Sequence, residues 1–401
     1  MRAAHILCLL LLASCGDEPF GPRYEGTTGA PVAMSLEGWV PRIEAVADGA
    51  PITVMIDTGS PLTVLALASR PPGEVRLQLR AFDLTFPDLP AVVASLFNDD
   101  GICDPPHPDG LLGGDLLRAF RLGLDYRGER AFLFDGADDD PPVADGTAGP
   151  VEVPIDVLGG GLARLDDVPD PVAVDATRVA VIGAAVEGST RVALVDTGAS
   201  LTVVSETLLK SLGESGRPSL CCETVSTIYG EVSARISRLR QLTLGGVTVK
   251  SLPVLVWDQP SFFDAISAEV GRDVQMLVGG SFLRRFAVKV DYRRERLELA
   301  RYQNQDHVDE DEFLGPGFTF CRPKVAAEGM VVVDVFQGTD AETQGVRSGD
   351  RLLSVDSQSV VGLSREEARA LLQKPAGSTV NLVFANNVKK TVKVERLLAD
   401  Y

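Results

Sequence analysis

The fold is decided by two stretches of sequence, VMIDTGSPLTVL at residues 54–65 and ALVDTGASLTVV at residues 193–204. Six of their twelve positions are identical, including Asp-Thr-Gly and the Leu-Thr-Val that follows. A second pair recurs in the same order, LLGGDLLRAFRLGLDYRGERAFLF at residues 111–134 and LVGGSFLRRFAVKVDYRRERLELA at residues 277–300. The copies are 139 and 166 residues apart, far longer than a solenoid unit of roughly 20–50 residues. The chain therefore contains a duplicated lobe.

Each copy is predicted to be β-structure. Apolar, β-branched runs flank Asp48-Gly49 in the first copy and Glu187-Gly188 in the second, a pattern typical of β-hairpins. These runs are residues 40–46, 52–56, 179–186 and 192–195. Two more strands are expected in each copy, within residues 120–134 and residues 286–299. Because helix signals are few, mainly β lobes are predicted at residues 31–135 and residues 151–302.

Composition limits the functions open to these lobes. The 401 residues include 38 Lys+Arg and 56 Asp+Glu, a net charge of −18, and 45% are hydrophobic, as in ordinary globular proteins. The length predicts two or three domains. The acidity excludes a nucleic-acid partner, because phosphate binding requires clustered Lys and Arg. Three scattered His are too few for a His-built zinc site, and no metal or cofactor is expected.

The N-terminal residues predict export. A short apolar run follows Arg2 and is too short to span a membrane, so residues 1–14 are interpreted as a signal peptide. Leu-Ala-Ser-Cys at residues 12–15 resembles the lipobox of bacterial lipoproteins, which implies lipidation of Cys15 and membrane attachment through the lipid. Residue 16 is Gly rather than Asp, which favours the outer membrane, facing the periplasm. The alternative is an ordinary signal peptide that contains Cys15 by chance.

Paired Asp-Thr-Gly motifs, each followed later by Gly-Gly, carry the predicted chemistry. Over about residues 31–301 this constellation resembles the pepsin/retropepsin group of aspartic peptidases. The resemblance implies a two-lobed acid-protease β-barrel fold in which Asp57 and Asp196 share one proton and activate a water against a peptide bond. By the same resemblance, Thr58 and Thr197 brace the two loops. Gly59 and Gly198 allow the tight turns that bring backbone N–H groups to the carboxylates.

The two copies differ between Asp-Thr-Gly and Gly-Gly. That interval is 56 residues in the first lobe and 83 in the second. The extra length includes residues 226–232, which are predicted to form a flap hairpin with Tyr229 and Gly230 near its tip. The first lobe has little room for a flap, whereas pepsin-like enzymes carry theirs on that lobe. The alternative for Tyr229 is an ordinary aromatic residue of a strand.

A third module is predicted at residues 312–398. Its order of segments resembles a PDZ domain of the bacterial envelope-peptidase type, a small α+β domain, with Gly-Asp-Arg at residues 349–351 as its most specific piece. Ser364 and Glu367 predict a capping box at the start of a helix over residues 365–373. The resemblance implies that a peptide C-terminus binds beside Gly317, Phe318, Thr319 and Phe320. The alternative is a closed PDZ domain that only packs on the lobes.

Two functions remain open on the sequence. The first is a single-chain aspartic endopeptidase in the cell envelope, acting on protein or peptide substrates and binding peptide C-termini through its PDZ domain. The second is a non-catalytic peptide-binding scaffold of the cell envelope, which the degenerate flap of the first lobe favours. A Cys hydrolase built on Cys103 and His107 is disfavoured, because no oxyanion-binding motif accompanies them. The sequence does not choose a disulfide pairing among Cys103, Cys221, Cys222 and Cys321.

Overall fold

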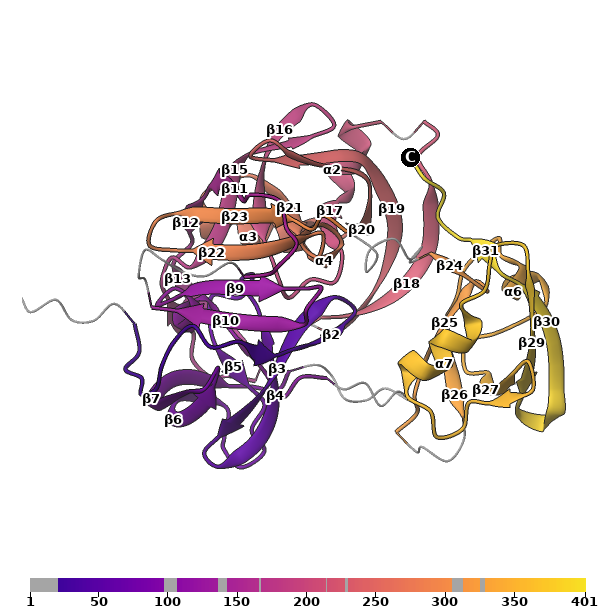
Figure 1. Ribbon diagram of the computed structural model, residues 1–401, viewed down its shortest axis with the longest axis horizontal. Helices are drawn as coiled ribbons and strands as arrows, with labels where there is room; N and C mark the ends of the chain where they lie inside the picture. The colour runs from indigo at the N-terminus through magenta and orange to yellow at the C-terminus, as the bar shows by residue number, and fades with distance from the viewer. Residues whose placement is uncertain are drawn as a thin grey trace, which may run out of the picture.

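The computed structural model describes residues 21–96, 107–135, 143–165, 167–213, 215–227, 230–304, 313–324 and 329–401. Strands dominate, and the few helices are short. Two β-sheet lobes lie against each other, and a smaller domain lies to one side of them (Figure 1). The lipobox cysteine, Cys15, and the predicted flap tyrosine, Tyr229, lie outside the described residues.

The first lobe is a seven-stranded sheet with the order β2-β3-β4-β8-β5-β7-β6. Its strands are β2 (Ser35–Glu37), β3 (Val40–Ala47), β4 (Ala50–Ile56), β5 (Val64–Leu65), β6 (Gly73–Ala81), β7 (Leu84–Val93) and β8 (Gly110–Leu112). The predicted hairpin around Asp48-Gly49 is formed by β3 and β4. β4 runs parallel to β8, and β5 runs antiparallel to β8 and parallel to β7. The short helix α1 (Gly114–Leu117) follows β8.

The second lobe repeats this pattern in an eight-stranded sheet, β12-β15-β16-β21-β17-β20-β19-β18. Its strands are β12 (Asp156–Leu158), β15 (Arg178–Val186), β16 (Ser189–Val195), β17 (Thr202–Ser205), β18 (Ser219–Thr227), β19 (Gly230–Leu244), β20 (Val247–Trp257) and β21 (Val274–Val278). The parallel pair β16 and β21 corresponds to β4 and β8 of the first lobe. The parallel pair β17 and β20 corresponds to β5 and β7. Strand β18 has no counterpart in the first-lobe sheet.

Helices and a small hairpin complete the second lobe. The helices are α2 (Glu206–Ser211), α3 (Pro260–Val270) and α4 (Gly280–Leu283). The hairpin of β13 (Gly161–Ala163) and β14 (Val172–Val174) lies in the chain between β12 and β15 of the second-lobe sheet but packs on the first lobe. Val172 and Val174 share a buried cluster there with Val40 and Met55.

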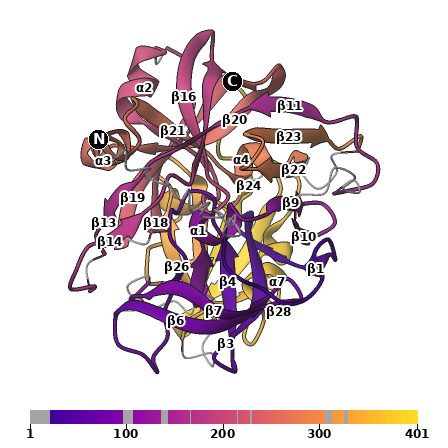
Figure 2. The ribbon, with the colours of Figure 1, turned by 90° about the vertical axis from the view of Figure 1, so that its left-hand side faces the viewer.

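One sheet belongs to both lobes. Its order is β1-β10-β9-β22-β23-β11, and its strands are β1 (Val32–Ala33), β9 (Arg121–Asp125), β10 (Arg130–Phe134), β11 (Val151–Pro154), β22 (Phe286–Asp291) and β23 (Arg296–Arg301). The second repeated motif supplies its four central strands, which lie between the lobes in two views (Figures 1 and 2). β9 and β22 pair antiparallel across the middle, with Leu124 opposite Val288. The duplicated halves are therefore joined by backbone hydrogen bonds.

The C-terminal domain has its own core. Its sheet order is β25-β26-β27-β29-β30, from β25 (Phe318–Cys321), β26 (Met330–Val335), β27 (Arg351–Val355), β29 (Thr379–Phe384) and β30 (Val388–Lys393). The remaining elements are β24 (Leu314–Gly315), α6 (Asp340–Thr343), β28 (Gln358–Ser359), α7 (Arg365–Leu372), η2 (Ala385–Asn387) and β31 (Glu395–Arg396). The predicted capping box of Ser364 and Glu367 is confirmed at the start of α7.

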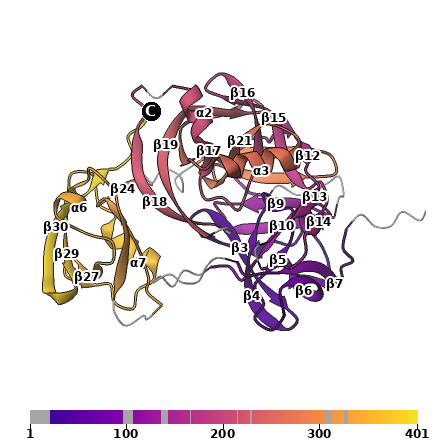
Figure 3. The same ribbon diagram turned by 180° about the vertical axis from the view of Figure 1, so that it is seen from behind.

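This domain is docked on the second lobe. Phe313, Phe336 and Leu398 share a buried cluster with second-lobe residues. The N–H of Gln337 donates to the carbonyl of Cys221 on β18 at 3.2 Å. The ring of the last residue, Tyr401, contacts the guanidinium groups of Arg217 and Arg240, whose Cζ atoms lie 4.8 and 4.6 Å from its centre. Figure 3 shows the domain beside β18 from behind.

The described residues also bear on the cysteines and on membrane insertion. Cys221 and Cys321 are both disulfide-bonded, whereas Cys103 and the side chain of Cys222 lie outside the description. In the described part of the chain, no helix is both long and apolar enough to cross a membrane.

Candidate active site

Equivalent strands deliver Asp57 and Asp196 to the middle of the molecule. Asp57 follows β4 and Asp196 follows β16, in both cases after a run of buried apolar residues. The N–H of Asp57 donates to the carbonyl of Leu112 on β8, and the N–H of Asp196 to that of Val278 on β21, both at 3.0 Å. The parallel strand pair in each lobe therefore fixes the backbone of its aspartate.

Four hydrogen bonds made by the hydroxyl groups of Thr58 and Thr197 connect the two loops. Thr58 Oγ1 donates to the carbonyl of Val195 at 2.8 Å, and Thr197 Oγ1 donates to the carbonyl of Ile56 at 2.7 Å. Each hydroxyl also accepts the backbone N–H of the other threonine, at 3.0 and 3.1 Å. Both threonines are fully buried. We call these four hydrogen bonds the threonine lattice.

The carboxyl group of each loop lies against the Asp-Thr-Gly glycine of the opposite loop. Asp57 Oδ1 accepts the N–H groups of Gly59 and Ser60 at 2.8 and 3.1 Å, and Asp196 Oδ1 accepts the N–H of Gly198 at 2.9 Å. A Cβ on Gly59 would lie 2.4 Å from Cγ of Asp196, and a Cβ on Gly198 would lie 2.6 Å from Cγ of Asp57. Glycine is therefore required at both positions, and the close approach brings Asp57 and Asp196 together as a dyad.

The dyad's environment favours its protonated form. Burial raises the pKa of Asp57 well above its usual range, and the negative charge of Asp196 raises that pKa further. Burial also raises the pKa of Asp196. Two carboxylates this close cannot both be ionised at low cost, so the pair retains one proton over the pH range between its two titration steps.

A second pair of contacts, which the sequence did not predict, supports the loops. Thr63 donates its hydroxyl and its N–H to the carboxylate of Asp115, at 2.7 and 2.9 Å. In the second lobe, Ser281 accepts the N–H of Thr202 at 2.9 Å. Asp115 and Ser281 both follow Gly-Gly in the repeat, and both threonines belong to Leu-Thr-Val. The repeat therefore contained the information that Asp115 and Ser281 occupy equivalent positions, although one is an acid and the other a hydroxyl residue.

Two tyrosines lie buried near the dyad at equivalent positions of the repeat. Tyr126 follows β9 and Tyr292 follows β22, and neither hydroxyl has a hydrogen-bond partner among the described residues. Burial raises the pKa of both phenols, and the charge of the other lobe's aspartate raises it further: Asp196 for Tyr126 and Asp57 for Tyr292. Both tyrosines therefore remain neutral beside the dyad.

The other predicted site residues lie elsewhere. Gly230 begins β19, which pairs with β18, with Thr227 opposite Gly230, so a hairpin is present at the predicted flap. Gly317 precedes β25 with a φ of 90°, where a side chain would be strained. Phe318 and Phe320 on β25 are buried in the core that also holds residues of α7, and Thr319 Oγ1 accepts the N–H of Asp334 at 3.1 Å. These residues are far along the chain from the dyad.

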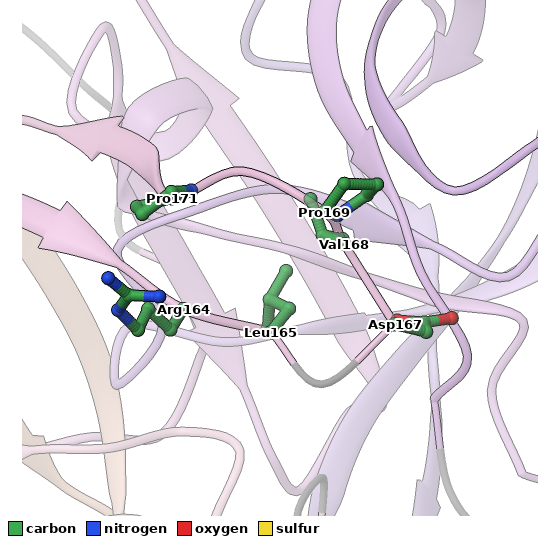
Figure 4. Close-up of a pocket in the computed structure, with 6 residues that line it drawn as sticks. All are labelled: Arg164, Leu165, Asp167, Val168, Pro169 and Pro171. Atoms are coloured by element: carbon green, nitrogen blue, oxygen red, sulfur yellow. The ribbon is translucent and has the colours of Figure 1, made fainter.

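A cavity of about 390 Å³ lies within the loop that connects β13 and β14 (Figure 4). Its lining residues are Arg164, Leu165, Asp167, Val168, Pro169 and Pro171. No dyad or lattice residue lines it, so it is separate from the candidate active site. Among the described residues, no group of three His, Cys, Asp or Glu is arranged to hold a metal ion.

Comparisons with known proteins agree with this site. Residues 182–282, which include Asp196 but not Asp57, match the family model described as aspartyl protease, and residues 331–386 match the PDZ domain. The search of curated proteins gave no match. The predicted fold class, a mainly β acid-protease-type β-barrel fold with an α+β PDZ domain, is confirmed.

Two solved structures are similar to parts of the chain. One is an aspartic proteinase from Irpex lacteus, with 15% identity and a TM-score of 0.41 over 70% of this chain and 99% of that one. The other is a photosystem II D1 C-terminal processing protease, with 27% identity and a TM-score of 0.20 over 21% of this chain. The chain spans 24% of that processing protease.

The threonine lattice predicts a large difference between two substitutions of Thr58. Thr58→Val removes the hydroxyl, so the buried carbonyl of Val195 and the buried N–H of Thr197 lose their hydrogen bonds to it. We expect a loss of about 2–5 kcal/mol in the free energy of unfolding, measured by chemical denaturation. Thr58→Ser keeps the hydroxyl and should lose less than half as much. Equal losses for the two variants would contradict a structural role for the lattice.

The raised pKa values predict a pH-dependent effect of Asp57→Asn. A carboxyl whose folded-state pKa exceeds its unfolded value contributes stability at low pH, and this contribution is lost as pH rises through the folded-state pKa. The asparagine of Asp57→Asn does not titrate, so this pH-dependent loss of stability does not occur in the variant. As pH is raised towards neutral, the variant should therefore become more stable than the wild type. Thermal unfolding over a pH series measures the difference, with the exposed Asp88→Asn as control. Parallel curves for wild type and Asp57→Asn would contradict the prediction.

Proposed function

We propose that the protein is a single-chain aspartic endopeptidase that hydrolyses peptide bonds with a water activated between Asp57 and Asp196. The observation that carries the proposal is the dyad itself, a buried and a partly buried carboxyl group from different lobes held together by the threonine lattice. Burying two like charges costs free energy, and a purely structural interface gains nothing from it. Perturbed carboxyl pKa values of this kind are typical of catalytic sites.

The proposed mechanism uses the single proton of the dyad. The ionised carboxylate accepts a proton from the water, whose oxygen attacks the peptide carbonyl carbon. The protonated carboxyl donates a hydrogen bond to the carbonyl oxygen, where negative charge develops. Collapse of the tetrahedral intermediate breaks the C–N bond, one of the two protons now on the pair passes to the leaving amine, and the pair is left with the single proton it began with. The N–H groups of Gly59, Ser60 and Gly198 hold the carboxylates in place throughout.

Peptide binding is assigned to two further elements. The hairpin of β18 and β19 is proposed to cover the substrate, because β18 is an extra strand without a counterpart in the first-lobe sheet that the structure describes. The PDZ domain is a peptide-binding module, and β25 forms one edge of its sheet. We propose that substrate or partner C-termini add beside β25 at Gly317 to Phe320.

Cleavage of a mixed peptide library by the purified protein, from acid to neutral pH, tests the activity. Asp57→Asn and Asp196→Asn should each abolish cleavage, because one carboxyl group cannot both accept and donate the protons of the reaction. Asp88→Asn, on an exposed ion pair with Arg76, should cleave at the wild-type rate. A wild type as inert as both dyad variants at every pH would instead support the scaffold function.

We further propose that the protein is attached to the envelope by lipid on Cys15 and lies at the outer membrane, facing the periplasm. Several acyl chains give a stable anchor, unlike a single chain. Cys15→Ser should abolish metabolic labelling with a radioactive fatty acid and release the protein into the soluble fraction of the cell. Labelling that persists in Cys15→Ser would exclude this cysteine as the lipidation site.

A further inference from the structure

Arg178 of the second lobe contacts the Asp-Thr-Gly loop of the first. It is the first residue of β15, and its Nη1 donates to the carbonyl oxygen of Gly59. That carbonyl belongs to the same peptide group as the N–H of Ser60, which donates to Asp57 Oδ1 at 3.1 Å. The guanidinium, the peptide group and the carboxylate therefore form one hydrogen-bonded chain. Each member of such a chain polarises the next and strengthens its hydrogen bond.

Glu269 on α3 fixes the guanidinium in this position. Nε of Arg178 donates to Oε1 of Glu269 at 2.6 Å, and Nη2 donates to Oε2 at 2.9 Å. This is the bidentate geometry that an Arg–carboxylate pair adopts when its orientation is defined. The arginine side chain is only 12% exposed. Its third nitrogen, Nη1, is thereby directed at the first-lobe loop.

The residue at the equivalent position in the other half of the repeat is uncharged. Arg178 lies 18 residues before Asp196, and the residue 18 before Asp57 is Trp39. Trp39 also contacts the opposite lobe, where the guanidinium carbon of Arg284 lies 3.8 Å from the centre of its ring. The Trp39 side chain carries no charge, so the two halves of the repeat differ in charge at this pair of positions.

We propose that Arg178, held by Glu269, is a positioning residue that fixes the first-lobe Asp-Thr-Gly loop and sets the pH range in which the dyad carries one proton. The catalytic consequence rests on the proposed function, whereas the effect on the dyad's titration does not. Nothing in the repeated motifs marks Arg178, because it lies outside them, before both motif copies of the second lobe.

The charges around the dyad are consistent with this role of Arg178. The guanidinium of Arg178 lowers the pKa of Asp57 and of Asp196, against the larger upward effect of burial. In the described part of the chain, Tyr126 after β9 interacts with Asp196, and Tyr292 after β22 interacts with Asp57 and with Asp115 on α1. Glu269 on α3 pairs with Arg178. The two phenols are neutral, so Arg178 is the positive charge that opposes burial here.

Two substitutions should move the dyad's titration in opposite directions. Arg178→Gln removes the positive charge, so both titration steps should shift to higher pH, by about one unit. Glu269→Gln keeps the hydrogen-bond acceptor but removes the neighbouring negative charge, so both steps should shift to lower pH. A merely structural pair would lose stability in both variants without this reversal of sign. Arg178→Lys keeps the charge and should restore the titration towards that of the wild type.

The dyad's titration is measured directly by NMR of protein labelled with ¹³C at the Asp carboxyl carbons. Signals are assigned by their loss in Asp57→Asn and Asp196→Asn. The matched control is Glu187→Gln, because Glu187 follows the other end of β15 and pairs with Arg217 through two hydrogen bonds of 2.8 and 3.0 Å. This control should leave the dyad's titration unchanged. The pH profile of kcat/KM is recorded in parallel.

The two readouts separate the two proposals. Opposite NMR shifts without any cleavage would support the role of Arg178 and contradict the endopeptidase. Cleavage with unshifted titrations in Arg178→Gln and Glu269→Gln would overturn the role of Arg178 alone. Should Arg178→Gln fail to fold, Glu269→Gln still decides, because the absence of a shift to lower pH in that variant overturns the proposal.

Discussion

The four hydrogen bonds made by the hydroxyl groups of Thr58 and Thr197 are the interaction on which the rest of the site depends. Each hydroxyl donates to a carbonyl of the opposite lobe and accepts an N–H from it, so none of these buried groups is satisfied unless the lobes are in register. An unsatisfied buried group costs about 1–3 kcal/mol. The lattice can therefore hold two carboxyl groups together that would otherwise repel. Burial at this junction raises the pKa of both aspartates, and the charge of Asp196 raises the pKa of Asp57 further.

The wider architecture keeps the lattice in place. The central sheet joins the lobes by backbone pairing between β9 and β22, directly before the two buried tyrosines. Asp115 and Ser281 then hold the Leu-Thr-Val segment of each lobe against its Gly-Gly helix. On the outside, the PDZ domain is docked on β18, a strand of the hairpin that we propose as the flap.

The sequence predicted those features that recur or that follow a local rule. The duplicated motifs identified the dyad and the threonines, and turn residues between β-branched runs located the hairpins of both lobes. The pairing of Arg178 with Glu269 was not predictable, because it joins residues 91 positions apart that no motif relates. The hairpin of β13 and β14 was missed because its short strands lie in a region rich in Gly and Pro. The docking of Tyr401 between two arginines depends on tertiary packing alone, and Tyr229 lies outside the described residues.

The central claim is that the two lobes hold Asp57 and Asp196 as a single unit with one proton. Neutron diffraction from deuterated crystals grown near neutral pH locates that proton directly. The account predicts one deuteron on the pair, hydrogen-bonded between the two carboxyl groups. Two fully ionised carboxylates without a deuteron between them would contradict it.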